Sequence, residues 1–182
     1  MDALGKIRKG CLKHSKADQY RLYAHFSKKM FGICLRFAAS YDEAQDILQE
    51  GFIKVFKHLP SFRGEGSLEG WIRQIFVNTA IEKFRERMYF LPLDDHSDYQ
   101  GYVAQNDGPG FLHTRDILAL VQQLPAQYRL VFNLYALEGY THKEIAKALQ
   151  ISESTSRSNL ARARILLREK INKDYRIAVN AV

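Results

Sequence analysis

The chain has 182 residues and a formal net charge of +7, which leaves room for one or two small domains with modest cores. It opens with no signal peptide and contains no apolar run of membrane-spanning length, so we expect a cytoplasmic protein without membrane insertion. Cys11 and Cys34 have neither a metal-binding nor a redox spacing, which favours reduced structural thiols.

The charge is distributed in three blocks. Residues 1–90 carry sixteen Lys and Arg against ten Asp and Glu, residues 91–116 carry one against five, and residues 117–182 carry ten against five. Two basic blocks separated by an acidic one indicate two DNA-facing modules joined by a tether. A basic excess also suits RNA or an anionic membrane, so charge alone does not choose the partner.

Two helices are predicted in the first third of the chain. Residues 17–39 place Tyr, Phe, Leu and Ile at helical intervals. Ser40 and Glu43 have the spacing of a capping box, which predicts the start of a second helix, and Pro60 ends it. The apolar face of this second helix consists of Leu48, Phe52, Val55, Phe56 and Leu59.

The opposite face of the second helix carries Asp46, Gln49 and Glu50. A solvated polar face is the ordinary interpretation of such a group. Because the rest of this half of the chain is positive, these residues also suggest a docking patch for a basic partner helix.

A loop with two glycines, residues 61–67, precedes a long amphipathic helix that begins at Leu68. Trp71 lies in the apolar stripe of this helix, where a tryptophan is more often a core residue than a stacking platform. A glycine-containing loop beside a basic helix can nevertheless receive an extruded base. The polar and basic residues that we place off the stripe or in the loop are Arg63, Arg73, Asn78, Arg85 and Arg87.

Residues 91–113 are rich in Asp, Gly, Pro and Ser, which predicts a flexible acidic linker. Helical periodicity resumes near Asp116 and breaks at Leu124 and Pro125, with the proline expected at a first-turn position. Another apolar helix is expected from Tyr128 to Leu137, and Gly139 ends it. The pattern contains no credible strand. The predicted fold is therefore all-α, with two small helical domains at 1–90 and 114–182 on either side of the linker.

The last third contains a helix-turn-helix pattern. Thr141 and Glu144 form a capping box, Ile151 can fill the turn, and Ser152 can cap the next helix. In that helix the spacing predicts an inward face of Ser156, Leu160, Ala163 and Leu167. The candidate DNA contacts on the outward side are Ser154, Thr155, Arg157, Ser158 and Arg162. An ordinary two-helix hairpin with a solvated arginine face is the alternative.

No catalytic or metal site is visible in the sequence. The carboxylates form no catalytic pair, and the six histidines show no ligand or triad spacing. We therefore expect a protein that is not an enzyme and that needs no metal or cofactor.

Three stretches resemble one family, the bacterial sigma factors of extracytoplasmic-function (ECF) type, group IV of the sigma-70 family. Residues 46–56 resemble the part of sigma domain 2 that docks on the clamp helices of the RNA polymerase β′ subunit. Residues 62–85 resemble the part that recognises and melts the promoter −10 element. Residues 124–132, with the helix-turn-helix, resemble domain 4, which reads the −35 element and rests on the β flap.

This resemblance implies a promoter-specificity subunit that binds core RNA polymerase, with an anti-sigma factor as a further partner. Asp46, Gln49 and Glu50 would face polymerase, and the outward residues of the helix-turn-helix would read the −35 element. The residues implied at the melted −10 element are Arg63, Trp71, Arg73, Asn78 and Arg85. In this chain Gln150 replaces the usual glycine of the turn, Glu82 a frequent aspartate, and Ser156 a common valine, which should loosen packing slightly.

Two other functions remain open on the sequence. A free-standing helix-turn-helix regulator would bind an operator tightly as a dimer, without polymerase. A nucleic-acid-processing enzyme would need a carboxylate or metal cluster, which the sequence does not offer.

Overall fold

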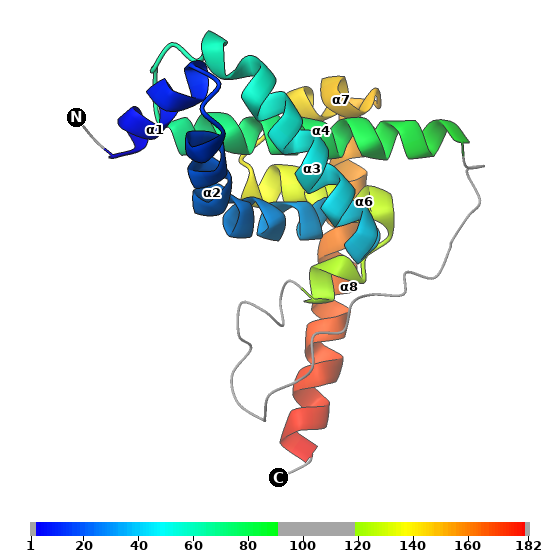
Figure 1. The fold of residues 1–182 in the computed structure, drawn as a ribbon. Helices are drawn as coiled ribbons and strands as arrows, with labels where there is room; N and C mark the ends of the chain where they lie inside the picture. The colour runs from blue at the N-terminus through cyan, green and yellow to red at the C-terminus, as the bar shows by residue number, and fades with distance from the viewer. Residues whose placement is uncertain (1–2, 91–118, 181–182) are drawn as a thin grey trace. The chain divides into compact units, whose positions relative to one another are not determined.

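The computed structural model describes residues 3–90 and 119–180, with the side chains of 3–88 and 119–172. Every regular element in these ranges is a helix (Figure 1). The chain divides into two compact units, Met1–Phe90 and Leu91–Val182. The predicted all-α class is confirmed, whereas the predicted linker at 91–113 lies outside the described residues.

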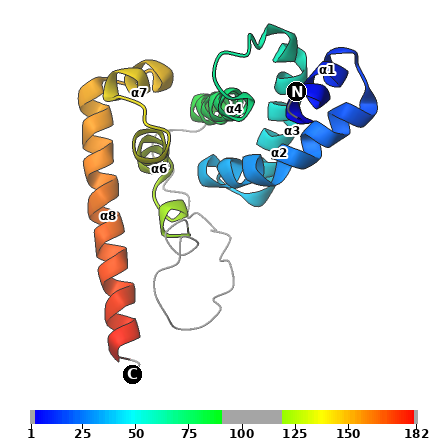
Figure 2. The same cartoon turned by 90° about the vertical axis from the view of Figure 1, so that its left-hand side faces the viewer.

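Unit 1 contains α1 (Ala3–Leu12), α2 (Lys16–Phe37), α3 (Tyr41–His58), the short 3-10 helix η1 (Leu59–Ser61) and α4 (Leu68–Phe90). The helices α2, α3 and α4 pack against one another, and α1 packs on α2 and η1 (Figures 1 and 2). Helix α1 was not predicted, and Cys11 is its one buried described residue. The largest buried side chains of this core are Leu22, Phe26, Met30, Ile47, Ile72 and Phe76.

A glycine allows α3 and α4 to approach closely. A Cβ atom at Gly51 would lie 2.4 Å from the ring of Phe76, which is fully buried. That ring also meets Phe52 edge-on, with 5.2 Å between centroids. The helix that carries the acidic residues is therefore held tightly against the long basic helix.

The predicted capping box of α3 is half right. Ser40 Oγ accepts a hydrogen bond from the Glu43 amide at 3.1 Å, as expected. The Glu43 carboxylate, however, accepts from the amide of Ala39 instead of that of Ser40, and it also lies 3.4 Å from Arg87. Arg87, which belongs to α4, therefore gives this carboxylate a tertiary contact that the local motif does not include.

Unit 2 contains a helical stretch at 119–122, then α6 (Ala126–Phe132), the π-helix η2 (Asn133–Leu137), α7 (His142–Leu149) and α8 (Glu153–Asn180). Two predictions are corrected here. Pro125 is the N-cap of α6 and not part of its first turn. The helix expected to run to Leu137 is α-helical only to Phe132 and then widens, with the Glu138 amide donating to the Asn133 carbonyl at 3.0 Å.

Unit 2 is assembled around α8. Helix α6 lies alongside α8, and α7 lies across its N-terminal end (Figure 2). Arg129 is also inside this unit, 2% exposed, and its Nη1 donates to the Gln122 carbonyl at 2.8 Å. One apolar core cluster of the unit consists of Leu120, Val121, Leu124, Ala163 and Leu167, with Tyr128 and Phe132 packed against it.

Candidate nucleic-acid interface and docking face

The helix-turn-helix begins at a complete capping box. The Thr141 hydroxyl accepts from the Glu144 amide at 3.2 Å, and the Glu144 carboxylate accepts from the Thr141 amide at 2.8 Å. The prediction is confirmed. Hydrogen bonds from the Thr141 amide and hydroxyl hold the pKa of Glu144 below its usual range, because they favour the charged carboxylate. The start of α7 is therefore fixed by two reciprocal hydrogen bonds.

The turn between α7 and α8 contains a strained residue. Gln150 has φ 56° and ψ 41°, the left-handed region that glycine occupies at lower cost. The next residue, Ile151, donates its amide to the Ala146 carbonyl at 3.1 Å. Ser152 then caps α8 by accepting from the Thr155 amide at 3.0 Å, as predicted. These bonds set the direction in which α8 leaves the turn.

The inward face of α8 is confirmed. Ser156 and Ala163 are fully buried, and Leu160 and Leu167 are 4% and 8% exposed. Ser156 has a polar partner, since its Oγ lies 2.9 Å from Nδ1 of His142. The serine that replaces the common valine therefore links α8 to the first residue of α7, a contact that the expectation of looser packing did not include.

The outward face of α8 presents Ser154, Arg157, Ser158 and Arg162, all exposed. Thr155 is half-buried, with its hydroxyl 2.8 Å from that of Ser152. Serine and arginine on one exposed helix face can enter a DNA groove, because serine is small and arginine can bind guanine edges or phosphate.

Both arginines of this face are held in place. Arg157 donates to Glu153, one turn earlier, at 2.8 Å. Arg162 donates to the hydroxyl of Tyr128 on α6 at 3.2 Å. Tyr128 was not predicted as a partner of Arg162, because it is 34 residues away and reaches the arginine only through the packing of α6 on α8.

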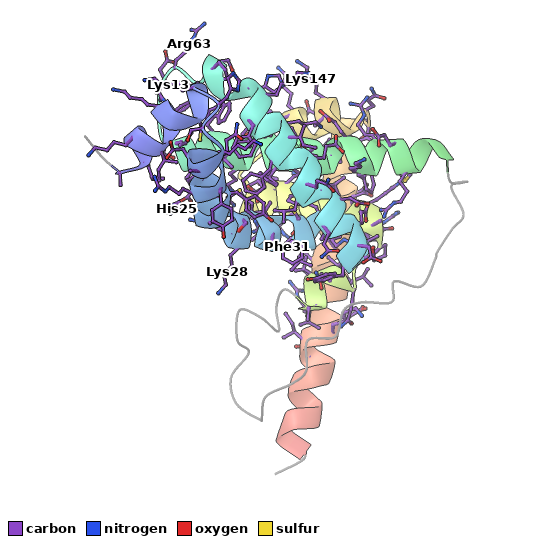
Figure 3. All side chains as sticks on the ribbon, in the orientation of Figure 1. Lys13, His25, Lys28, Phe31, Arg63 and Lys147 are labelled. Atoms are coloured by element: carbon purple, nitrogen blue, oxygen red, sulfur yellow. The ribbon has the colours of Figure 1, made fainter. Side chains whose placement is uncertain are left out.

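In unit 1, the loop before α4 presents Arg63, which is exposed (Figure 3). Gly64 and Gly66 have φ 82° and 79°, a conformation that side-chain-bearing residues rarely adopt. Trp71 is half-buried, and its ring lies 5.3 Å from that of Phe62 between centroids. The tryptophan is thus neither a core residue nor a free platform, because one side of it supports the loop.

Helix α4 brings some of the predicted residues together and separates another. Trp71, Asn78 and Arg85 are seven residues apart, so they lie on one stripe that drifts by only about 20° per step. Asn78 is exposed, and its Oδ1 accepts from the side-chain amide of Gln74 at 3.0 Å. Arg85 is half-buried.

Arg73 does not belong to this stripe. It projects from the side of α4 that carries Val77, Ala80 and Phe84, all of which are buried further along the helix. Placing Arg73 off the apolar stripe was therefore wrong. The arginine itself is half-buried, because this side of α4 is less covered at the start of the helix.

The acidic face of α3 is more constrained than the sequence suggested. Asp46 and Gln49 are exposed, but Glu50 lies between two lysines, 2.8 Å from Lys54 Nζ and 3.0 Å from Lys83 Nζ. The hydrogen bond from Lys54, with that from Lys83, holds the pKa of Glu50 below its usual range. Since Lys83 is on α4, this carboxylate fixes the acidic face to the long basic helix.

An exposed isoleucine extends the acidic face. Ile53 is 59% exposed, and it lies seven residues after Asp46 and four after Gln49, on the same side of α3. A large apolar side chain among carboxylates suits a partner that covers both. Ile53 was not predicted as part of this face, although the same helical spacing places it there.

The remaining chemistry of the described residues is limited. No group of three or more His, Cys, Asp and Glu in the described ranges is placed to hold a metal ion. None of the helices that the structure describes is long and apolar enough to cross a membrane. Both cysteines are buried, and burial raises the pKa of the Cys34 thiol to about 12, so this thiol is a structural group.

Comparison with known proteins adds a family to this geometry. The Sigma-70 region 2 family matches residues 22–88, and the Sigma-70 region 4 family matches residues 114–167. The RNA polymerase sigma-H factor of Pseudomonas aeruginosa is 32% identical over 155 residues, which cover 79% of this chain and 80% of that protein. The ECF RNA polymerase sigma-E factor of Haemophilus influenzae is 27% identical over 162 residues, or 82% of this chain and 85% of that protein.

Among solved structures, the sigma factor RpoE of Bartonella quintana in complex with the anti-sigma factor NepR has a similar fold. The TM-score is 0.55 at 20% sequence identity, and the match covers 85% of this chain and 97% of that chain. Both sigma-70 regions are therefore present in order, in a chain whose sequence and fold match sigma factors along most of its length. The chain belongs to the extracytoplasmic-function sigma factors of RNA polymerase, within the sigma-70 family.

Proposed function

We propose that this chain is the promoter-specificity subunit that binds core RNA polymerase and directs it to promoters with matched −35 and −10 elements. The observation that supports the proposal is that one chain has two different surfaces suited to DNA. Unit 2 has an exposed polar and basic helix face suited to a duplex groove, and unit 1 has a half-buried tryptophan beside a glycine loop, suited to unstacked bases.

For the −35 element, the proposed reading surface consists of Ser154, Thr155, Arg157, Ser158 and Arg162 on α8. Support comes from their position on the first turns of a helix whose start is fixed by the Ser152 cap. The first turns of a recognition helix are the part that enters the major groove. Arg157 and Arg162 would then leave their present partners, Glu153 and Tyr128, and bind base edges or phosphates instead.

For the −10 element, we propose that the loop containing Arg63 captures an unstacked base beside Trp71, with Asn78 and Arg85 along the same stripe of α4. Unstacking one base costs about a few kcal/mol, and stacking on an aromatic ring can offset about 1–3 kcal/mol of this. Arg73 remains a candidate on a different side of the helix, where it would reach the DNA backbone and not the captured base.

For polymerase, the proposed docking face consists of Asp46, Gln49 and Glu50 on α3, with the exposed Ile53 among them. The resemblance to the family supports a contact with the β′ clamp helices here and with the β flap on unit 2. In this assignment the chain has no reaction of its own and works in the cytoplasm with polymerase. We also propose an anti-sigma partner, as in the complex of the RpoE relative with NepR.

Run-off transcription with purified core polymerase on genomic fragments tests the proposal. A sigma factor yields discrete transcripts that require both the chain and core enzyme. The alternative, a free-standing regulator, requires an isolated dimer with tight sequence-specific DNA binding. A dimer by analytical ultracentrifugation, together with operator binding that core polymerase does not affect, would overturn the proposal.

The docking face has its own test. Asp46→Lys is expected to weaken binding to core polymerase by at least tenfold, about 1.4 kcal/mol, because it places a cation against a basic partner helix. Its thermal unfolding should match that of the unmodified chain, since Asp46 is exposed. Glu169→Lys, an equal charge change at an exposed site of α8, is the control, and equal affinities for both variants would reject the assignment.

A further inference from the structure

The segment at residues 3–16, which contains α1, carries most of the net positive charge of unit 1. Residues 3–16 carry five Lys and Arg and no Asp or Glu, whereas residues 17–90 are almost balanced, with eleven against nine. The region 2 match begins only at residue 22, so this basic segment lies outside the matched part of the family. Its charge is therefore a feature of this chain that the assigned domain does not account for.

The basic side chains of α1 are presented to solvent. Lys6 and Lys9 lie one turn apart on the exposed side of α1, opposite the buried Cys11, and the exposed Lys13 follows in the turn to α2. Lys6 and Lys13 have no carboxylate partner among the described residues. Elsewhere in unit 1, by contrast, Lys29, Lys54 and Lys83 are each engaged in an ion pair. The charges of Lys6 and Lys13 are thus left for a partner outside the chain.

Helix α1 contacts the loop at residues 61–67, which is the proposed base-capture loop. The Arg8 guanidinium lies over the ring of Phe62, 5.3 Å from its centroid, and Phe62 in turn contacts Trp71. A Cβ atom at Gly64 would lie 3.8 Å from Nη1 of Arg8. Figure 3 shows Lys13 and Arg63 at the same end of unit 1. The basic surface of α1 is therefore continuous with the loop, whose one acidic residue is Glu65.

We propose that Lys6 and Lys9 of α1, with Lys13 in the turn after it, bind the phosphate backbone of the promoter strand that flanks the base captured by the loop. The proposal rests on the −10 assignment of the loop. Charge complementarity and continuity with that surface favour DNA as the occupant. Lysines on a flexible stem neutralise phosphates without reading bases, so α1 adds affinity and no sequence preference. Arg8 would position α1 against the loop.

The test compares Lys6→Gln/Lys9→Gln/Lys13→Gln with the unmodified chain in holoenzyme. Two labelled single strands of equal length are titrated at several salt concentrations: the −10 strand of a promoter found by run-off, and oligothymidylate. We expect weaker binding of both strands by the same factor. The slope of log K against log salt should fall by about 0.7 per lysine, or about 2 in total, through lost counterion release.

A matched pair of single variants controls for net charge. Lys13→Gln should reduce the salt slope, whereas Lys28→Gln, at an exposed lysine of α2 remote from the loop in Figure 3, should not. Equal slopes for these two variants overturn the proposal. It is also overturned if the triple variant loses affinity for core polymerase, or for phosphatidylglycerol vesicles, while its DNA slope stays unchanged.

Failure of the −10 assignment gives a different result. Trp71→Ala should abolish the preference for the promoter strand over oligothymidylate and leave the salt slope unchanged. If that preference survives, the base-capture assignment fails, whatever the α1 variants show. If it is lost while the triple variant keeps the full salt slope, the −10 assignment stands and the proposal for α1 fails.

Discussion

One buried hydroxyl ties the recognition helix to the helix before it. Ser156 is fully buried, and its Oγ lies 2.9 Å from Nδ1 of His142. The His142 ring stacks on that of Tyr135, with 4.7 Å between centroids. The Arg164 guanidinium lies over the Tyr135 ring, 5.8 Å from its centroid. Residues from η2, α7 and α8 thus meet at one polar contact.

Ser156→Ala should destabilise unit 2 by about 1 kcal/mol, because the His142 nitrogen loses its partner inside a packed seam. Hydrogen exchange of the α7 amides in the full chain measures the loss as faster exchange. Ser158→Ala is the matched control, since Ser158 is exposed and its hydroxyl donates only to the Thr155 carbonyl. Equal protection in both variants would mean that the Ser156 contact does not stabilise the seam.

At the scale of the element, the contact between α3 and α4 depends on one missing side chain. Gly51 faces the buried ring of Phe76, and an ion-pair cluster of Glu50, Lys54 and Lys83 flanks it on the surface. The close approach and the ion pairs fix the proposed docking helix to the proposed −10 helix.

Gly51→Ala should destabilise unit 1 by about 1–3 kcal/mol, because the overlap of the new methyl with Phe76 exceeds the gain in helix propensity of roughly 1 kcal/mol. Trp71 is the one tryptophan of the chain, so its fluorescence during urea unfolding reports on unit 1 alone. Gly32→Ala on α2 meets nothing within 4 Å and should be stabilising. A stabilising Gly51→Ala would show that the helices can separate without cost.

The capping box of α7 makes the stability of unit 2 depend on pH. Because the pKa of Glu144 is lowered in the folded state, its contribution is complete above the unfolded value, near 4.5, and is lost as the pH falls through the folded pKa. Glu144→Gln should therefore expose the α7 amides to faster hydrogen exchange at pH 7, with a smaller difference from the unmodified chain at low pH. If the difference in exchange rate did not change with pH, the charge of Glu144 would not be the cause of the stabilisation. Glu169→Gln, which removes a carboxylate outside the capping box, is the control.

For the whole molecule, the division into two units separates two steps of initiation. The −35 contacts would belong to unit 2 and base capture to unit 1. Because the two proposed sites lie in different units, we expect the free-energy effects of their variants to add. Promoter binding through the −35 contacts and strand opening can then be impaired one at a time.

Arg157→Ala should weaken promoter binding by about 1–3 kcal/mol, a loss that a higher holoenzyme concentration recovers in run-off transcription. Trp71→Ala should slow strand opening, measured by permanganate reactivity of thymines, and a higher concentration should not recover it. Trp71→Phe keeps a ring against Phe62 and should retain part of the opening rate. Recovery of Trp71→Ala at high concentration would contradict a role in opening.

Several features of this protein follow from its sequence alone. The helical class, the Thr141 capping box, the Ser152 cap and the inward face of α8 were all predicted, and the structure confirms them. Each is a short-range signal, because caps join residues three apart and a helical face repeats every three or four positions. The family resemblance was also visible in the sequence, since its motifs are contiguous.

Only the tertiary structure decided what those faces meet. Lys54 pairs with Glu82 across 28 residues, and Arg162 donates to Tyr128 across 34. The contact of Arg8 on α1 with Phe62 in the loop, and the place of Arg73 on the buried side of α4, also depend on packing. The physical reason is that periodicity determines which side of a helix is apolar, whereas the partner of each side chain depends on how separate helices pack in three dimensions.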